Sequence, residues 1–471
     1  MTKKIRLNAF NMNCVGHIHH GLWKHPRDNS VDYTRPQYWI ELAQLLERGL
    51  FDAVFLADIV GVYDVLGDGI EATAREAVQL PVNDPLYVVP LMAHATKHLG
   101  FGVTCNLTYE QPYLFARRMA TLDHLSDGRV GWNIVTGYLD SAARAMGLKQ
   151  QIDHDDRYDR GDDFMEVFYK LLEGSWEDDA VRKDRAHGIY ADPRKIHRVQ
   201  HNGPFYKVDN VYNLTEPSIQ RTPVLYQAGA SQRGNEFAAR HAECVFTGGP
   251  SREGLAKVVS NIRKLAVDAG RAPNDILVFS GLTVVVDTNE KAAREKYEDY
   301  KQYASAEASL AHMCSGAAID LERFGLDEEI TPEKLEALYP GRLKRVGNVR
   351  GRHFLEGTTR RKLLQSRGFC AQNSAIVGTP SQVVDEIAKY VAETDLDGFN
   401  LTRTVAPETY RDFIDLVIPE LQNRGLYKEK YEDGSLRQKL FGRGDRLPQG
   451  HTAAQYRFHA TSAEELRPTG S

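Results

Sequence analysis

Cysteine is scarce in this chain of 471 residues. The five cysteines stand far apart, at positions 14, 105, 244, 314 and 370, and no two of them form a C-x-x-C pair. A disulfide framework needs cysteines that pair, and a structural zinc site usually needs closely spaced ones. The sequence therefore predicts neither, and we expect a protein of the reducing cytoplasm.

Long apolar runs and an excess of positive charge are also missing. The longest apolar runs have the length of a strand and fall short of the ~20 residues that a membrane span needs. The first ten residues, MTKKIRLNAF, alternate polar and apolar positions, unlike a secretory signal. The net charge is −5, with no basic stripe to neutralise phosphates. We expect no membrane partner and no nucleic-acid partner.

No G-x-G-x-x-G follows any predicted strand, which removes the usual signature of an open dinucleotide-binding sheet. What the chain does contain is a regular alternation of short apolar runs with segments of helical periodicity. Because these runs are rich in β-branched and aromatic residues without strict alternation, they indicate strands buried on both faces. Eight runs can be counted, at 5–12, 51–58, 101–109, 129–137, 223–231, 242–249, 276–286 and 397–402. Eight such units predict a closed (β/α)8 TIM barrel with inserted segments.

We expect residues 1–425 to form one barrel domain. Two stretches, at about 138–222 and 288–375, are too long to be simple connections and are expected as insertions at the catalytic face. The segment 426–471 is polar and contains glycine and proline. It is expected as a C-terminal extension on the surface or at a subunit interface.

Four histidines crowd the stretch GHIHHGLWKH, directly after the first predicted strand. A barrel hydrolase that begins with His17-x-His19 would need further histidines and an Asp at later strand ends, but these read QAGASQRG, FTGGP and FNLTRT. A metal-dependent hydrolase is therefore a remote alternative. Solvated loop histidines are a second alternative, and a lining of a pocket by His17, His19 and His20 is the favoured one.

The strand ends carry small, neutral hydrogen-bonding groups and few charges. Asp58, Thr104 and Thr136 stand at three of them, with asparagines and glycines beside them. Such a lining suits a flat polar heterocycle. The turn QAGASQRG could bind a phosphate through backbone N–H groups and the Ser231 hydroxyl, although a plain helix N-cap is the favoured role for Ser231 when this turn is taken alone. His154 and Tyr158, one helical turn apart, could reach the same phosphate.

Several longer runs resemble a known family. They are LERGLFDAVFLAD, VNDP, EQPYLFARRMATLDHLSDGRVGWNIVT, HDDRYDRGDDFMEV, GSWEDDA, ADPRKIH and PVLYQAGAS, in matching order from about residue 5 to about 440. The chain resembles the bacterial-luciferase-like FMN-dependent monooxygenases, in the branch of the nitrilotriacetate and dibenzothiophene sulfone monooxygenases. The resemblance implies reduced FMN (FMNH2) as cofactor and O2 as co-substrate. It also implies a separate NAD(P)H:FMN reductase as partner, and a homodimer or homotetramer.

The resemblance also implies roles for particular positions. The residues expected to bind FMN are Asp58, Thr104, Thr136, His154, Tyr158, Ala230 and Ser231, with His154, Tyr158 and Ser231 at the phosphate. The residues expected to line the substrate pocket are Phe10, Cys14, His17, His20, Tyr63, Gln79, Tyr138, Phe246 and His312. Tyr63, Thr136 and His312 are the expected catalytic residues, and no metal is expected. Position 138 carries a tyrosine in this chain, whereas related branches of the superfamily tend to carry a histidine there.

The implied reaction is a monooxygenation through a flavin C4a-hydroperoxide. One oxygen atom would pass to a small organosulfur compound such as dimethylsulfide, with C–S cleavage, and the other would leave as water. An aromatic sulfone, an aminopolycarboxylate or a halogenated aromatic are alternative substrates, and Arg233 and Arg352 are the cations available for a polycarboxylate. A deazaflavin-dependent oxidoreductase on the same barrel, or a non-catalytic flavin-binding protein, are more distant alternatives.

Overall fold

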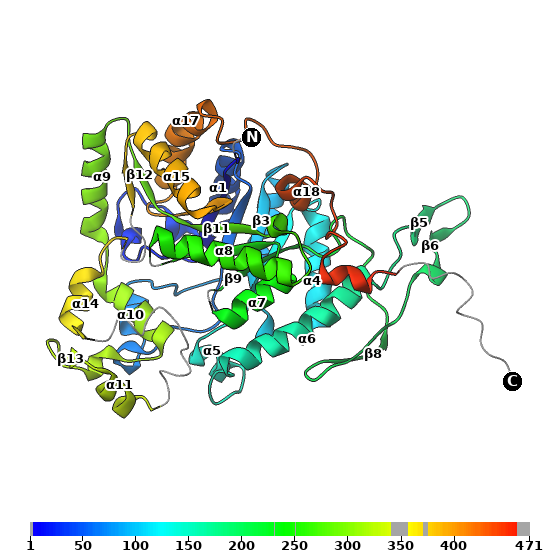
Figure 1. Cartoon of the computed structure of the whole chain (residues 1–471), viewed down its shortest axis with the longest axis horizontal. Coiled ribbons are helices and arrows are strands. Elements are labelled where there is room, and N and C mark those ends of the chain that lie inside the picture. Colours follow the sequence, from blue (N-terminus) through cyan, green and yellow to red (C-terminus); the bar gives the residue numbers. More distant parts are fainter. Residues whose placement is uncertain (1–2, 230, 250, 341–356, 371–374, 459–471) are drawn as a thin grey trace.

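The computed structural model describes residues 3–229, 231–249, 251–340, 357–370 and 375–458. Its centre is a closed barrel of eight parallel strands, in which each strand pairs with the next one along the chain and the last pairs with the first (Figure 1). The barrel strands are β1 (Arg6–Met12), β2 (Ala53–Ala57), β3 (Gly100–Asn106), β4 (Val130–Val135), β9 (Val224–Ala228), β10 (Cys244–Thr247), β11 (Leu277–Leu282) and β16 (Gly398–Thr402). The predicted (β/α)8 barrel is confirmed, and each of the eight apolar runs overlaps one of its strands.

Helices surround the barrel and connect its strands. They are α1 (Pro36–Arg48), α3 (Val89–His94), α4 (Pro112–Leu125), α6 (His154–Glu173), α7 (Gln232–His241), α8 (Arg252–Asp268), α15 (Pro380–Thr394), α16 (Glu408–Asp412) and α17 (Ile418–Asn423). Helix α3 is short, and a 3-10 turn (Pro85–Val88) directly precedes it.

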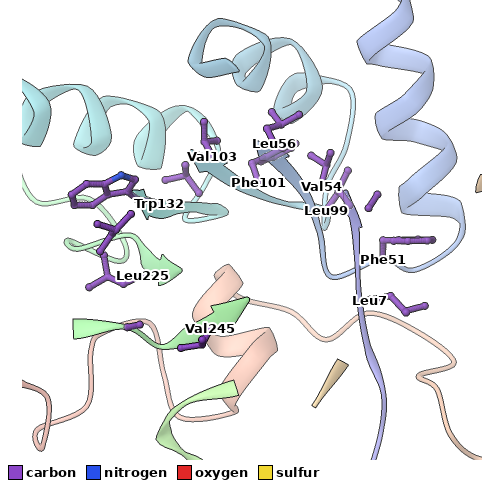
Figure 2. Packing of buried hydrophobic residues seen from close by; sticks show 14 of the residues in the cluster. Leu7, Phe51, Val54, Leu56, Leu99, Phe101, Val103, Trp132, Leu225 and Val245 are labelled. Carbon is purple, nitrogen blue, oxygen red and sulfur yellow. The ribbon is translucent and has the colours of Figure 1, made fainter. Parts of the chain in front are cut away.

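Strands buried on both faces explain why the apolar runs do not alternate with polar residues. On the outer face, Leu7 and Ala9 of β1 belong to the large core between strands and helices, and Figure 2 shows further members of this layer. On the inner face, Phe10 contacts Phe55, whose ring packs against Tyr226. The barrel is therefore filled with side chains and is not a pore.

The segment 138–222 contains α5 (Asp140–Ala145), α6 and two hairpins. The hairpins are β5–β6 (Val181–Asp184, Ile189–Ala191) and β7–β8 (Val199–Asn202, Lys207–Val211), and they extend away from the barrel on the right of Figure 1. Helix α6 packs on α4 and α7 and so belongs to the helical layer of the barrel.

The second long segment begins with α9 (Glu290–Tyr303), at the upper left of Figure 1, and then forms a small lobe at the lower left. The elements of this lobe are α10 (Ala306–Ala317), β13 (Glu329–Ile330), α11 (Pro332–Leu338), β14 (Thr358–Thr359) and α14 (Arg360–Ser366). Leu310, Phe324 and Leu363 belong to an apolar cluster of this lobe, which also includes Leu66 from the loop after β2. The lobe thus packs on the barrel at the end where the strands finish.

The chain after residue 425 closes the opposite end of the barrel. Leu436 and Leu440 of α18 (Leu436–Phe441) are fully buried and belong to the same cluster as Phe55 and Tyr226. Between them, the Arg437 guanidinium donates to both carboxylate oxygens of Glu243, at 2.7 and 2.9 Å. This part of the expected surface extension is therefore buried, because the open end of the barrel needs apolar side chains to cover it. Among the described residues, no helix combines the length and apolar character that a membrane span requires.

Candidate active site

A cavity of about 320 Å³ lies where β2, β3, β4 and β9 end. The residues that line it are Asp58, Ile59, Val60, Thr104, Asn106, Val135, Thr136, Gly137, Tyr138, Leu139, His154, Arg157, Tyr158 and Ala228. Barrel enzymes place their active sites at this end of the strands, and the size is in the range of small-molecule pockets.

Side chains from β3 hold the wall of the cavity in place. Thr104 Oγ1 accepts a hydrogen bond from Asn133 Nδ2 (2.8 Å), so the threonine hydroxyl keeps its own proton for another acceptor. Thr108 Oγ1 donates to the Thr136 carbonyl oxygen (2.8 Å) and fixes the chain beyond β4. Gly137 follows with φ +70°, and a Cβ there would lie 2.3 Å from Asn106 Nδ2. Glycine is therefore required at this position for both its backbone conformation and the close approach.

Among the described residues that line this cavity, Asp58 is the only one with a carboxyl group. Burial raises its pKa to about 8, the nearby Asp84 carboxylate adds to the rise, and a hydrogen bond from the Ile59 N–H opposes it. The Asp58 side chain is therefore largely protonated at neutral pH.

The opposite side of the cavity carries positive charge. Arg157 is 7% exposed, its guanidinium donates to the Ile152 carbonyl oxygen, and its Nε has no hydrogen-bond partner. His154 begins α6, and the Tyr158 hydroxyl lies one turn further along the helix, 3.4 Å from Gln227 Nε2. A buried guanidinium with an unused N–H at the start of a long helix provides what an anion needs.

Ser231 acts as the N-cap of α7: its Oγ accepts a hydrogen bond from the Gly234 N–H at 3.0 Å. A Cβ on Gly234 would approach Tyr158 Oη and Ser231 Oγ within 2.8 and 2.9 Å, so both hydroxyls converge on the first turn of this helix. The N-cap role expected as an alternative is thus present, and the Ser231 hydroxyl also forms a hydrogen bond with the Tyr158 hydroxyl. Ala230 lies outside the described residues.

A second cluster of polar side chains lies next to the cavity and meets it at Tyr138. Tyr63 Oη donates to Gln79 Oε1 (2.8 Å) and lies 3.0 Å from Tyr138 Oη. The Tyr63 ring stacks on the His312 imidazole with centroids 4.8 Å apart, and His312 Nδ1 lies 3.0 Å from His20 Nε2. Helix α10 of the inserted lobe supplies His312, so this cluster joins the lobe to the barrel.

These groups are uncharged at neutral pH. Burial lowers the pKa of His312 to about 4, and it lowers the pKa of His20 well below its usual value, with His312 adding to the effect. Burial also raises the pKa of Tyr63 well above its usual value. The cluster therefore offers hydrogen bonds without ionic charge.

Aromatic contacts surround this cluster. The Phe10 ring contacts the rings of His17 and Phe246, with centroids 4.6 and 5.1 Å apart. Cys14 Sγ donates to the Gly16 carbonyl oxygen, and burial raises the pKa of the thiol to about 12. Of the predicted pocket residues, only Tyr138 lines the cavity, and the others are packed in the adjoining clusters.

The histidines of the first loop are buried, so the alternative of solvated histidines is wrong. His17, His19 and His20 are 4%, 8% and 3% exposed, and His19 Nε2 lies 3.0 Å from Thr402 Oγ1. Burial and, to a smaller extent, the positive charge of Arg403 together lower the pKa of His19 to about 4. The loop folds inward because its imidazoles find hydroxyl and imidazole partners between the barrel and the lobe.

Within the described ranges, one group of side chains has the proximity that a metal site requires, and it does not include this loop. It consists of Asp163 and Glu166 on α6 with His201 on β7. The Lys170 ammonium lies 2.8 Å from Glu166 Oε1 and 3.1 Å from His201 Nδ1, so a cation already occupies the centre of this group.

Arg157 is the main feature of the cavity that the sequence analysis missed. In HDDRYDRGDD it stands among charges typical of an exposed helix face, and the sequence analysis names only His154 and Tyr158 from this stretch. The signal was its position next to Tyr158 in the first turn of the helix, which turns both side chains towards the strand ends.

Comparison with known proteins shows the family to which this chain belongs. Residues 17–396 match the family model described as Luciferase-like monooxygenase. The chain belongs to the luciferase-like monooxygenase family. Like other enzymes of this family, it is a flavin-dependent monooxygenase that uses reduced FMN and O2.

Three relatives place it more closely. The long-chain alkane monooxygenase of Geobacillus thermodenitrificans (strain NG80-2) is 49% identical over 97% of this chain and 99% of its own length. A crystal structure of a long-chain alkane monooxygenase superposes with a TM-score of 0.88 at 48% sequence identity. The match covers 97% of this chain and all of that chain. The dimethyl-sulfide monooxygenase of Hyphomicrobium sulfonivorans is 44% identical over 97% of this chain and 94% of its own. A crystal structure of a riboflavin lyase with modified FMN and riboflavin is 37% identical, with a TM-score of 0.88 over 97% of this chain and all of its own.

The residues of the cavity fit FMN. Among the described residues, Arg157 Nε has no hydrogen-bond partner, and with the Tyr158 hydroxyl it suits the phosphate group. Thr104 and Asp58 offer further hydrogen bonds in the same cavity, and Val60, Val135 and Leu139 supply apolar surface for a flat ring.

Proposed function

We propose that this enzyme oxygenates a small, uncharged, apolar molecule, with an organosulfur compound such as dimethylsulfide as the first candidate. Balanced for dimethylsulfide, reduced FMN, O2 and (CH3)2S would give oxidised FMN, water, formaldehyde and methanethiol, with oxygen inserted into a C–H bond next to sulfur before the C–S bond breaks. A long-chain alkane is the second candidate, because the alkane monooxygenase shares 49% of its residues with this chain.

The observation that carries this proposal is the neutrality of the cluster beyond Tyr138. Tyr63, Gln79, His20 and His312 offer hydrogen bonds but no counter-charge for an ionised substrate. An aminopolycarboxylate would need cations here. Arg233 is engaged by Asp159 and Asp162 at 2.8 and 2.6 Å, and Arg352 lies outside the described residues.

The bound flavin supplies the activation of O2, and the protein binds it, orients it and excludes water. We propose that Asp58, Thr104, Thr136 and Ala230 contact FMN, as the resemblance implies, with Asp58 and Thr136 closer to the ring. We assign the phosphate to His154, Tyr158 and Ser231, and we add Arg157. We propose Tyr63, Thr136 and His312 as catalytic donors. The remaining pocket residues are Phe10, Cys14, His17, His20, Gln79, Tyr138 and Phe246, which would shape the substrate site.

The substrate proposal is tested with purified enzyme, FMN, NADH and a generic flavin reductase under O2. Dimethylsulfide, a long-chain alkane, dibenzothiophene sulfone and nitrilotriacetate are offered separately, and products are measured by gas chromatography or mass spectrometry. We expect formaldehyde and methanethiol from dimethylsulfide and no product from nitrilotriacetate. If only the alkane gives a product, an alcohol, the proposed monooxygenation stands and the substrate class is a long-chain alkane in place of an organosulfur compound. Turnover of nitrilotriacetate alone would contradict the proposal of an uncharged substrate.

Replacing Arg157 by methionine is expected to weaken FMN binding about 10- to 100-fold, since a hydrogen bond to a charged group contributes about 1.5–3 kcal/mol. Riboflavin, which lacks the phosphate, should bind the variant as well as it binds the wild type. Arg160→Met is the matched control, because the Arg160 guanidinium donates to Tyr206 Oη (2.9 Å) and does not line the cavity. Fluorescence titration of both flavins measures the effect. An equal loss for riboflavin would show that Arg157 does not act on the phosphate.

We also propose that reduced FMN comes from a separate NAD(P)H:FMN reductase and that the enzyme works in the cytoplasm as a homodimer or homotetramer. The five free cysteines are compatible with a reducing compartment. Tyr87 (77% exposed), Leu91 and Leu114 are exposed apolar side chains on or beside helices α3 and α4, where a second copy could cover them. Light scattering after gel filtration measures the assembly.

A further inference from the structure

Asp58 occupies an unusual position in the cavity. It directly follows β2, and it faces a lining that includes Ile59, Val60 and Val135. In the described part of the chain, no lysine, arginine or histidine forms an ion pair with it. A carboxylate in such surroundings loses hydration without gaining a counter-ion, so its charged form is disfavoured.

The other titratable groups around Asp58 do not supply a positive charge at close range. Asp84 lies on the neighbouring loop, where its Oδ1 accepts from the Leu86 N–H, and its negative charge adds to the cost of ionising Asp58. The thiols of Cys14 and Cys105 are neutral, because burial raises the pKa of each. The remaining titratable groups of the cavity are on other elements: Tyr138 after β4, and His154, Arg157 and Tyr158 on α6.

We propose that Asp58 binds the isoalloxazine ring as a neutral carboxylic acid, donating its proton to an acceptor on the ring. This inference rests on the proposed binding of FMN in the cavity. A protonated carboxyl group is both a donor and an acceptor, whereas its ionised form is an acceptor only. Ionisation would therefore remove the donated hydrogen bond and place a second negative charge beside Asp84 and an electron-rich ring.

The proposal predicts that FMN affinity depends on pH. The pKa of Asp58 is about 8 in the free protein. Below that pH the proton is in place and affinity is constant. Above it, binding must also take up a proton, so the dissociation constant rises by up to about tenfold per pH unit. The phosphate of FMN, with a second pKa of about 6, is fully ionised throughout this range and does not contribute.

The experiment is a titration of the full-length protein with oxidised FMN between pH 6.5 and 9.5, followed by flavin fluorescence. The wild type should lose affinity about tenfold between pH 8 and 9.5. Asp58→Asn should show no pH dependence over this range, because the amide donates at every pH. Asp84→Asn should begin to lose affinity at lower pH than the wild type, since removal of the neighbouring charge lowers the pKa of Asp58. Asp64→Asn, which alters a carboxylate paired with Arg144 outside this cavity, should behave as the wild type does.

Infrared difference spectra provide a second readout that does not depend on affinity. The addition of FMN at pH 7.5 should shift a protonated carboxyl C=O band, and Asp58→Asn should lack that band. Circular dichroism checks that the variant is folded. A wild-type affinity that is flat to pH 9.5, or a fall that persists in Asp58→Asn, would overturn the inference while leaving FMN binding intact. No binding of FMN by the wild type at any pH would instead overturn the proposed function.

Discussion

Replacing Tyr63 by phenylalanine is expected to lower product formation about 100-fold while FMN binding stays within a factor of about two, because positioned proton donors and electrostatic stabilisers contribute rate factors of this size. The Tyr63 hydroxyl connects Gln79 and Tyr138 through hydrogen bonds of 2.8 and 3.0 Å. Phenylalanine preserves the ring that stacks on His312 and removes only the hydroxyl group. The loss should therefore appear in catalysis and not in folding.

The measurement compares product formed with O2 consumed. Without the Tyr63 hydroxyl, we expect O2 consumption to continue and hydrogen peroxide to replace much of the oxygenated product. Tyr113→Phe is the matched control: its hydroxyl donates to the Tyr212 carbonyl oxygen (2.9 Å) at the protein surface, so coupling should be unchanged. If Tyr63→Phe forms product at the wild-type ratio, the hydroxyl has no part in oxygen transfer.

Replacing Arg437 by methionine is expected to lower the free energy of unfolding by about 3–5 kcal/mol, the cost of leaving one partner of a buried ion pair uncompensated. Arg437 and Glu243 are each 2% exposed. The guanidinium also donates to the carbonyl oxygens of Gln220, Thr222, Pro223 and Asp445. Its removal would take a donor from each of these carbonyl oxygens at the closed end of the barrel. It would leave the Glu243 carboxylate with the Leu225 N–H as a donor but without its cation.

Guanidinium chloride unfolding followed by circular dichroism measures this loss. Arg294→Met is the control, because its exposed pairing with Glu290 one helical turn away should contribute only about 0.3–0.5 kcal/mol. The double variant Arg437→Met/Glu243→Gln should recover part of the stability, since it no longer buries an unpaired charge. A single-variant loss below about 1 kcal/mol would show that this ion pair does not hold the C-terminal segment in place.

Local sequence patterns were sufficient for the barrel and insufficient for the packing around its mouth. The run FDAVFLAD predicts β2 and puts Asp58 at its end, and the lining of the cavity includes this residue. In contrast, GHIHHGLWKH left three roles open for its histidines. Their burial is seen only in the tertiary structure, where Thr402 from the last strand and His312 from the inserted lobe provide partners for His19 and His20.

Arg157 and Arg437 show the same limit for charged side chains. Both stand in stretches that read as solvated, DDRYDRGDD and GSLRQKLFG, because local composition reports the average environment of a segment. Arg157 is buried because the first turn of α6 lies against the ends of the strands. Arg437 is buried because α18 covers the opposite end of the barrel, where Glu243 directly precedes β10.

The sequence by itself determined the order of strands and helices, the closed barrel, the family, and the end of the barrel at which the chemistry takes place. These follow from short-range periodicity and from motifs whose residues are neighbours in the chain. Only the tertiary structure decided which side chains share the cavity, which histidines are buried, and that the surroundings of Asp58 raise the pKa of its carboxyl group. Burial and the distance to other charges set those properties, and both depend on residues hundreds of positions apart.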